Sequence, residues 1–83
     1  MKSLAFFTSN DNQEVTAIRM FLNLKGIKYK EYNISESEIA QKLYTKNQIT
    51  HIPTVVVFGE DNVILNTIVG YNKLELVKLA NNL

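Results

Sequence analysis

The order of strand-like and helix-like segments constrains the fold of this 83-residue chain more than any other feature. Residues 4–7 form a short apolar run typical of a buried strand, and residues 13–25 repeat apolar side chains at helical spacing. Residues 27–34 return to a strand-like pattern, and residues 35–38 open a second helix. A strand, a helix and a strand in succession predict a parallel pair joined by a right-handed crossover.

The second half of the chain predicts a hairpin followed by a helix. Thr54–Phe58 is almost entirely β-branched and aromatic, residues 59–62 have turn composition, and Val63–Val69 forms the second arm. Asn72 can cap a last helix. The apolar residues of that helix are Leu74, Leu76, Val77 and Leu79. The sequence therefore predicts one α/β domain over residues 1–83, in which a four-stranded mixed sheet combines a parallel βαβ unit with a C-terminal hairpin and three helices cover both faces.

Individual side chains give more detailed expectations. Asp11 followed by Glu14 fits a variant of the capping box at the start of the first helix. Gly26 stands where a left-handed C-terminal cap is expected. Met20 lies among polar positions, and we interpret it as a gap-filling side chain or as an exposed contact residue. The predicted buried face of the second helix consists of Ile39, Ala40, Leu43 and Tyr44.

Composition and charge exclude several classes of function. The formal net charge is +1 and no basic run is present, so a nucleic-acid groove is not expected. The apolar run at the N-terminus stops after Phe7, which is too short for a signal core or a membrane span, and we expect a cytoplasmic protein without a membrane partner. The chain has no cysteine, which rules out disulfides, thiolate metal sites and a thiol nucleophile. A single histidine is a poor metal site, so no metal is expected.

Several short motifs follow one another along the chain: Ala5–Thr8 in the first strand, Gly26–Tyr29 and Asn33–Ser35 around the second strand, Ile52–Val55 at the proline, and Val69–Asn72 before the last helix. In this order and spacing they resemble the glutaredoxin family. An aromatic residue after the glycine of the last motif is similar to the small glutaredoxin-like electron donors of ribonucleotide reductase. The resemblance covers the whole chain and implies a thioredoxin-like fold with a cis peptide bond before the proline.

The chain departs from that family at the positions that carry its chemistry. At family spacing from Gly26, the two redox cysteines fall on Asn12 and Val15. A thiolate at a helix N-terminus attacks a disulfide, and the second thiol resolves the mixed disulfide. An amide and an isopropyl group can perform neither step, and they cannot bind an iron–sulfur cluster as thiolates do. We therefore expect a protein that keeps the fold and is not an enzyme of this type.

The resemblance also implies a binding groove. The backbone of Ile52, before Pro53, would pair with a substrate peptide or glutathione, and Val69–Asn72 would supply the amides and helix start that hold a glutathione carboxylate. Val69 and Asn72 replace the usual glycine and acidic residue, so a plain turn and cap is the competing interpretation. Pro53 could equally serve only to rigidify the start of a strand.

The predicted function is non-catalytic binding of a peptide or partner protein, without a cofactor unless glutathione binds. One alternative is a glutathione transferase-type enzyme in which the hydroxyl of Thr8 or Ser9 stabilises an external thiolate. Another is a self-associating structural protein joined through Met20 and nearby apolar positions. The residues predicted to line the groove, beside Asn12 and Val15, are Thr8, Ser9, Ile52, Pro53, Val69, Gly70, Tyr71 and Asn72.

Overall fold

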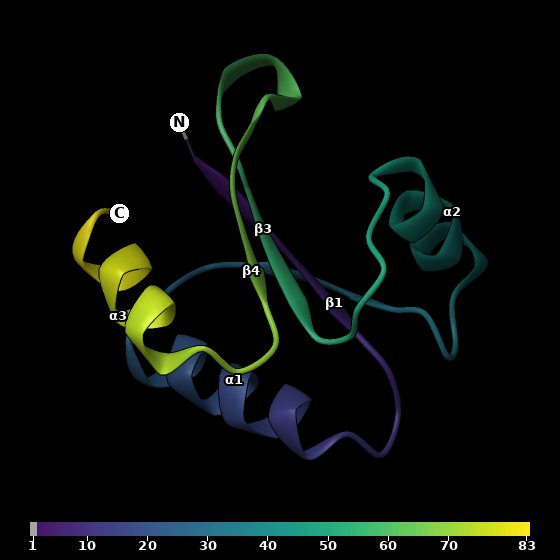
Figure 1. Cartoon of the computed structure of the whole chain (residues 1–83), viewed down its shortest axis with the longest axis horizontal. Coiled ribbons are helices and arrows are strands. Elements are labelled where there is room, and N and C mark those ends of the chain that lie inside the picture. The colour runs from purple at the N-terminus through teal and green to yellow at the C-terminus, as the bar shows by residue number, and fades with distance from the viewer. Residues whose placement is uncertain (1) are drawn as a thin grey trace.

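The computed structural model describes residues 2–83 and has the predicted alternation of strands and helices (Figure 1). In chain order the elements are β1 (Ser3–Thr8), α1 (Gln13–Leu24), β2 (Lys30–Asn33), α2 (Glu38–Lys46), β3 (Thr54–Phe58), the short 3₁₀ turn η1 (Glu60–Asn62), β4 (Ile64–Val69) and α3 (Lys73–Asn81). The strand predicted over residues 27–34 is shorter than expected, because only its second half pairs with β1.

The four strands form one mixed sheet in the order β2-β1-β3-β4. The β1–β2 pair is parallel, with Ala5 opposite Lys30, whereas β1–β3 and β3–β4 are antiparallel. A register shift between Val57 and Phe58 interrupts the hairpin near its turn. The predicted βαβ unit and C-terminal hairpin are therefore confirmed.

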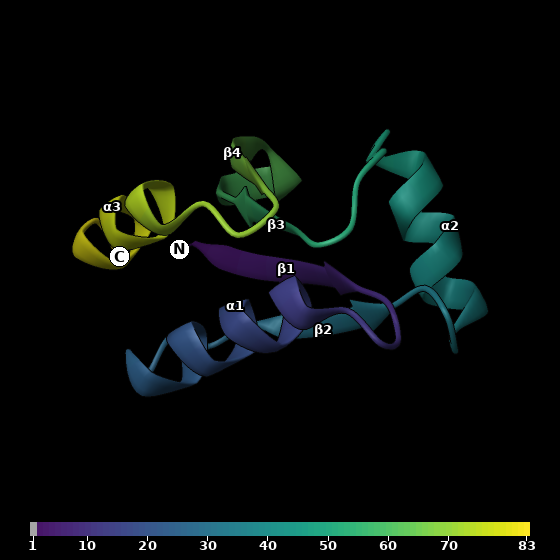
Figure 2. The same ribbon diagram turned by 60° about the horizontal axis from the view of Figure 1, so that its bottom comes forward.

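Alternating side chains of the strands divide the core into two layers. Phe6 and Val55 point to the face that α1 and α3 cover, where they pack against Ile18 and Leu76. Phe7 and its neighbours point to the other face, which α2 covers through Leu43 and Tyr44. Figure 2 shows α2 well separated from α1 and α3. The prediction that three helices cover both faces is confirmed.

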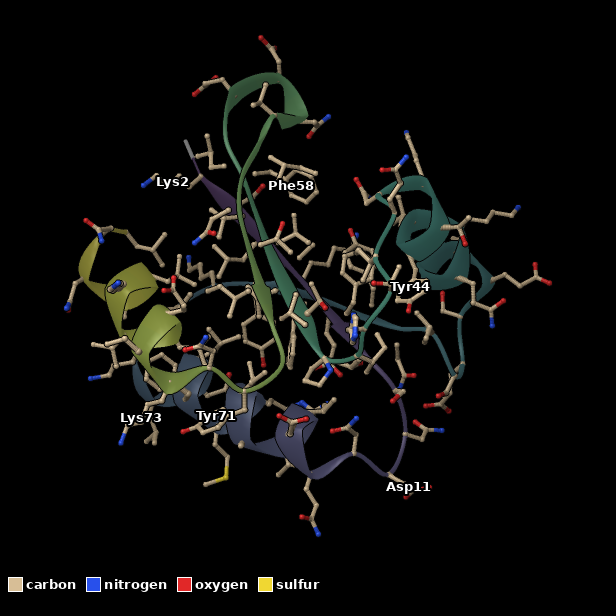
Figure 3. All side chains as sticks on the ribbon, viewed as in Figure 1. Lys2, Asp11, Tyr44, Phe58, Tyr71 and Lys73 are labelled. Carbon is tan, nitrogen blue, oxygen red and sulfur yellow. The ribbon has the colours of Figure 1, made fainter. Side chains whose placement is uncertain are left out.

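The helix ends are largely as predicted. Gly26 has φ +65°, and the amides of Gly26 and Ile27 donate to the carbonyls of Asn23 and Leu22, which is a Schellman C-cap. The predicted N-cap at Asp11 is wrong. Asp11 is exposed at the outer rim of the loop before α1 (Figure 3), and Asn12 caps the helix instead.

Several apolar side chains of the helices are exposed although their helices pack on the sheet, among them Ile39, Met20, Leu74 and Val77. Ile39 is 68% exposed, because α2 turns its Ala40, Leu43 and Tyr44 side to the sheet, so its predicted burial is wrong. Helix α3 buries Leu76 and Leu79, three residues apart on one face. The interpretation of Met20 as a gap filler is wrong. The exposed fractions of the remaining three are 59% for Met20, 65% for Leu74 and 36% for Val77.

Candidate binding groove

The two positions where the related family has cysteines serve the structure of α1. Asn12 precedes the helix in extended conformation, and its Oδ1 accepts hydrogen bonds from the amides of Glu14 (2.9 Å) and Val15 (3.2 Å). The side chain of Val15 is 3% exposed and packs in the core with Ile18. The amide oxygen thus satisfies the free N–H groups of the first turn, and neither side chain can act as a nucleophile.

The proline loop approaches this helix from the sheet. The Ile52–Pro53 peptide bond is cis, and Pro53 is buried at the start of β3. The carbonyl of Pro53 accepts a hydrogen bond of 2.7 Å from the amide of Gly70. The hydroxyl of Thr54 donates to the carbonyl of His51 at 2.7 Å. These bonds fix the loop on both sides of the proline.

The turn after β4 joins the proline loop to helix α1. Gly70 has φ +70°, a left-handed conformation that favours glycine. The amide of Tyr71 donates to Oε2 of Glu14 at 3.0 Å, which brings the main chain of Tyr71 to the first turn of α1 (Figure 3). Asn72 caps α3 by accepting from the amide of Glu75. Glu14 therefore links two segments that are 57 residues apart in the sequence.

Glu14 is the residue of this region that sequence reasoning missed. The spacing of Asp11 and Glu14 had suggested a capping box, but the carboxylate turns away from its own helix start to the Tyr71 amide. Nothing in the local pattern signals this contact, because it depends on how β4 returns to α1. The Glu14 carboxylate thus accepts the hydrogen bond of the Tyr71 amide, one of the amides that the resemblance assigned to a glutathione carboxylate.

The structure brings most of the predicted groove residues together. Hydrogen bonds connect Pro53 to Gly70 directly, and Tyr71 to the first turn of α1 through Glu14. Val69 does not line the groove with these residues. It pairs with Thr54 and lines a separate hollow with His51 and Ile64.

Thr8 belongs to a charged network next to the groove and not to the groove surface. Its side chain is fully buried and donates a 3.0 Å hydrogen bond to Oε2 of Glu31. Arg19 donates to both oxygens of the same carboxylate, with Nε 3.0 Å from Oε1. Hydrogen bonds from Arg19, opposed in part by burial, hold the pKa of Glu31 below its ordinary value, and the same pair raises the pKa of Arg19. The Thr8 hydroxyl is therefore committed within the protein.

Ser9 is the more accessible of the two hydroxyl candidates. It is partly exposed and lines a shallow hollow at the first turn of α1, together with Asn12, Thr16 and Arg19. Asp11 and Arg19 are the charged residues that line this hollow, and Arg19 is already paired with Glu31.

The described residues 2–83 contain one histidine, His51, and no cysteine. No group of three or more His, Cys, Asp or Glu side chains among them is arranged to hold a metal ion. None of the helices in that part of the chain is long and apolar enough to cross a membrane. His51 is exposed, and its Nδ1 lies 3.0 Å from the hydroxyl of Thr50.

Comparisons with known proteins establish the fold. No protein-family model matches the chain, and no curated protein matches it in sequence. Among solved structures, thioredoxin O2 from Arabidopsis thaliana has a TM-score of 0.80 at 18% identity, covering 100% of this chain and 75% of that one. The thioredoxin of Malassezia sympodialis has a TM-score of 0.79 at 15% identity, covering 98% and 73%. The thioredoxin-like protein BC3987 has a TM-score of 0.74 at 20% identity, covering 93% and 99%.

These similarities show that the chain has the thioredoxin fold. Because it has no cysteine, it cannot itself carry out the dithiol exchange for which a sulfur nucleophile is required. The solved structures support a thioredoxin-like fold in general and do not single out glutaredoxins.

Proposed function

We propose that this chain is a redox-inactive, glutaredoxin-like protein that binds an extended peptide, or an extended segment of a partner protein, along the loop at Ile52 and Pro53. The proposed binding requires neither dithiol chemistry nor a cofactor. The groove comprises the proline loop, the Gly70–Tyr71 turn and the first turn of α1.

The observation that carries the proposal is the unpaired main chain of Ile52. Within residues 2–83, no hydrogen bond is formed by the amide or the carbonyl of Ile52, although the residues around it are tied down. The side chain is only partly exposed and packs against both core layers, so the backbone is held in place. A fixed N–H and C=O pair at the end of a strand is what an extended peptide uses when it adds to a sheet.

Electrostatics at the same groove favour a peptide over a small anion. The Tyr71 amide already donates to the Glu14 carboxylate, which would also repel a second carboxylate placed there. Tyr71 is 40% exposed and offers an aromatic wall that can pack on apolar side chains of a peptide. Glutathione binding through this turn is accordingly disfavoured.

Amide chemical-shift mapping of isotope-labelled protein tests the proposal. Titration with a pool of unstructured peptides is expected to shift the amides of Ile52, Thr54 and Tyr71, whereas glutathione is expected to leave them in place. Peptide shifts confined to other surfaces, or glutathione shifts at Tyr71, would contradict the proposal.

A matched pair of variants separates a groove contact from a general loss of apolar surface. Tyr71→Ala removes the aromatic wall and is expected to weaken the best peptide by about five-fold, equivalent to about 1 kcal/mol. Leu74→Ala removes a side chain that is 65% exposed on α3 and should leave that affinity unchanged. Equal effects of the two changes would argue against binding at the groove.

A further inference from the structure

A second concave surface lies on the α2 face of the sheet, away from the groove. It is a cavity of about 410 Å³ next to the C-terminal end of α2. Its principal walls are Phe7, Lys30, Tyr32, Leu43, Lys46 and Phe58. We call it the α2-side cavity.

The cavity exists because α2 is too short to cover its face of the sheet. The helix has nine residues and packs through Leu43 and Tyr44, while the hairpin between β3 and β4 extends past it (Figure 1). Figure 3 shows Phe58 at the hairpin end of the sheet and Tyr44 on α2, at separate places. The cavity is lined by residues of the strands together with Leu43 and Lys46 of α2.

The α2-side cavity extends along β1 from the Ser3–Phe58 end of the sheet to Phe7. In the β1–β3 pairing, Ser3 is opposite Phe58 and Phe7 is opposite Thr54. The groove adjoins Pro53, before Thr54. The residues assigned to the groove are not among those that line the cavity.

The floor of the cavity suits a planar apolar group. The rings of Phe7 and Tyr32 are stacked, with centroids 5.3 Å apart and an interplanar angle of 22°. Phe58 forms a further wall and remains partly exposed. Aromatic walls of this kind stabilise a bound ring through offset or edge contacts, and the volume is within the range of small-molecule sites.

The charges around the cavity have one sign. Lys30 and Lys46 line it, and no carboxylate does. The Lys30 ammonium lies 5.6 Å from the centre of the Tyr32 ring, so it is held close to the apolar floor. Lys46 belongs to the last turn of α2, where the helix dipole favours a cation. Long lysine stems allow both ammonium groups to reach an anion at the rim.

We infer that the α2-side cavity binds a small aromatic carboxylate, with the ring against the partly exposed Tyr32 and Phe58 and the carboxylate between Lys30 and Lys46. The aromatic side chains supply the apolar contact, and the two lysines supply positive charge opposite the carboxylate. Neither component is part of the peptide groove.

Binding of 2-naphthoate to the full chain tests this inference, with 2-naphthamide as the neutral control of the same shape. Amide shifts on adding 2-naphthoate are expected at Lys30, Tyr32 and Phe58, and 2-naphthoate is expected to bind more tightly than 2-naphthamide. Added salt should weaken the binding of 2-naphthoate and leave the binding of 2-naphthamide unchanged.

Charge-removing variants give the second measurement. Lys30→Gln and Lys46→Gln are each expected to weaken 2-naphthoate by roughly two- to five-fold, the effect of one solvent-exposed ion pair. Lys28→Gln and Lys42→Gln, which remove exposed lysines outside the cavity, are the matched controls and should have no effect. The inference is overturned if 2-naphthoate does not bind, if it binds no better than 2-naphthamide, or if all four variants behave alike.

Discussion

Removing the charge of Glu31 is the perturbation whose effect can best be worked out from this structure. The carboxylate accepts hydrogen bonds from Arg19 through both oxygens and from the buried hydroxyl of Thr8. The side chains of Arg19 and Glu31 are 39% and 26% exposed, so the pair is neither a surface pair nor a fully buried one. Glu31→Gln keeps the shape and one acceptor oxygen, and places an amide group against a guanidinium donor.

The expected loss lies between two limits. Exposed ion pairs contribute about 0.2–1 kcal/mol, and breaking a buried pair costs about 3–5 kcal/mol. With partial exposure and one hydrogen bond retained, we expect Glu31→Gln to lower the free energy of unfolding by about 1.5 kcal/mol at pH 7. For a domain of this size, that corresponds to a decrease in Tm of roughly 6–12 °C.

The pH dependence has a definite sign. Since the pKa of Glu31 is lower in the folded protein than its ordinary value of 4.5, its contribution is fully present above that value. The contribution is lost as the pH falls through the folded pKa, because protonation removes the partner of Arg19. The difference in stability between wild type and Glu31→Gln should therefore shrink as the pH is lowered from 7 toward 2.

A double-mutant cycle followed by urea unfolding and circular dichroism measures this contribution. The cycle compares wild type, Arg19→Met, Glu31→Gln and the double variant, and its coupling energy should be about 1 kcal/mol at pH 7. Glu75→Gln is the control, because Glu75 pairs with Lys78 at 3.7 Å on the surface and should cost less than about 0.5 kcal/mol. A coupling energy below about 0.3 kcal/mol, or a difference that does not change with pH, would refute the reasoning.

Three further predictions concern the helices and the turn. Asn12→Ala should lower the free energy of unfolding by about 1 kcal/mol through loss of the N-cap, whereas Asn12→Asp should not; equal melting temperatures of the two would contradict the cap assignment. Leu22→Ala, in the core, should cost about 2–5 kcal/mol, and Leu24→Ala, at a side chain 83% exposed, should cost little; chemical denaturation compares them, and similar midpoints would be inconsistent with the packing. Glu14→Ala frees the Tyr71 amide and should allow glutathione to shift its resonance, while Glu14→Gln keeps an acceptor and should not; silence in both variants would show that this amide is no anion site.

The groove illustrates why the sequence could predict some contacts and not others. Pro53 and Gly70 were expected at its edge because the resemblance to the glutaredoxin family implies a groove at the proline segment and at the glycine before the last helix. The Gly70–Pro53 hydrogen bond follows from the pairing of β3 with β4, which the hairpin pattern predicted. The Glu14–Tyr71 contact joins two loops whose separation depends on the whole fold, and no periodic pattern records it.

The charged network next to the groove was invisible in the sequence for the same reason. Thr8 was considered as a free hydroxyl by analogy with glutathione transferase-type enzymes, in which a hydroxyl in this region stabilises a thiolate. Its commitment to Glu31 depends on the parallel pairing of β1 with β2, which places Glu31 opposite Phe6. The sequence shows that a hydroxyl is present at position 8, but it does not show that this hydroxyl is already hydrogen-bonded to Glu31.

The sequence by itself determined the alternation of strands and helices, the mixed sheet and the loss of dithiol chemistry, because periodicity, turn residues and the absence of sulfur are local or compositional properties. Only the tertiary structure decided which apolar side chains are buried. Ile39 and Leu74 are as apolar as the buried residues of their helices, but they point away from the sheet and are exposed. The tertiary structure also decided that Glu14 accepts the hydrogen bond of the Tyr71 amide and that a cavity lies next to α2. Those features arise from the relative placement of elements, which depends on packing between residues distant in the chain.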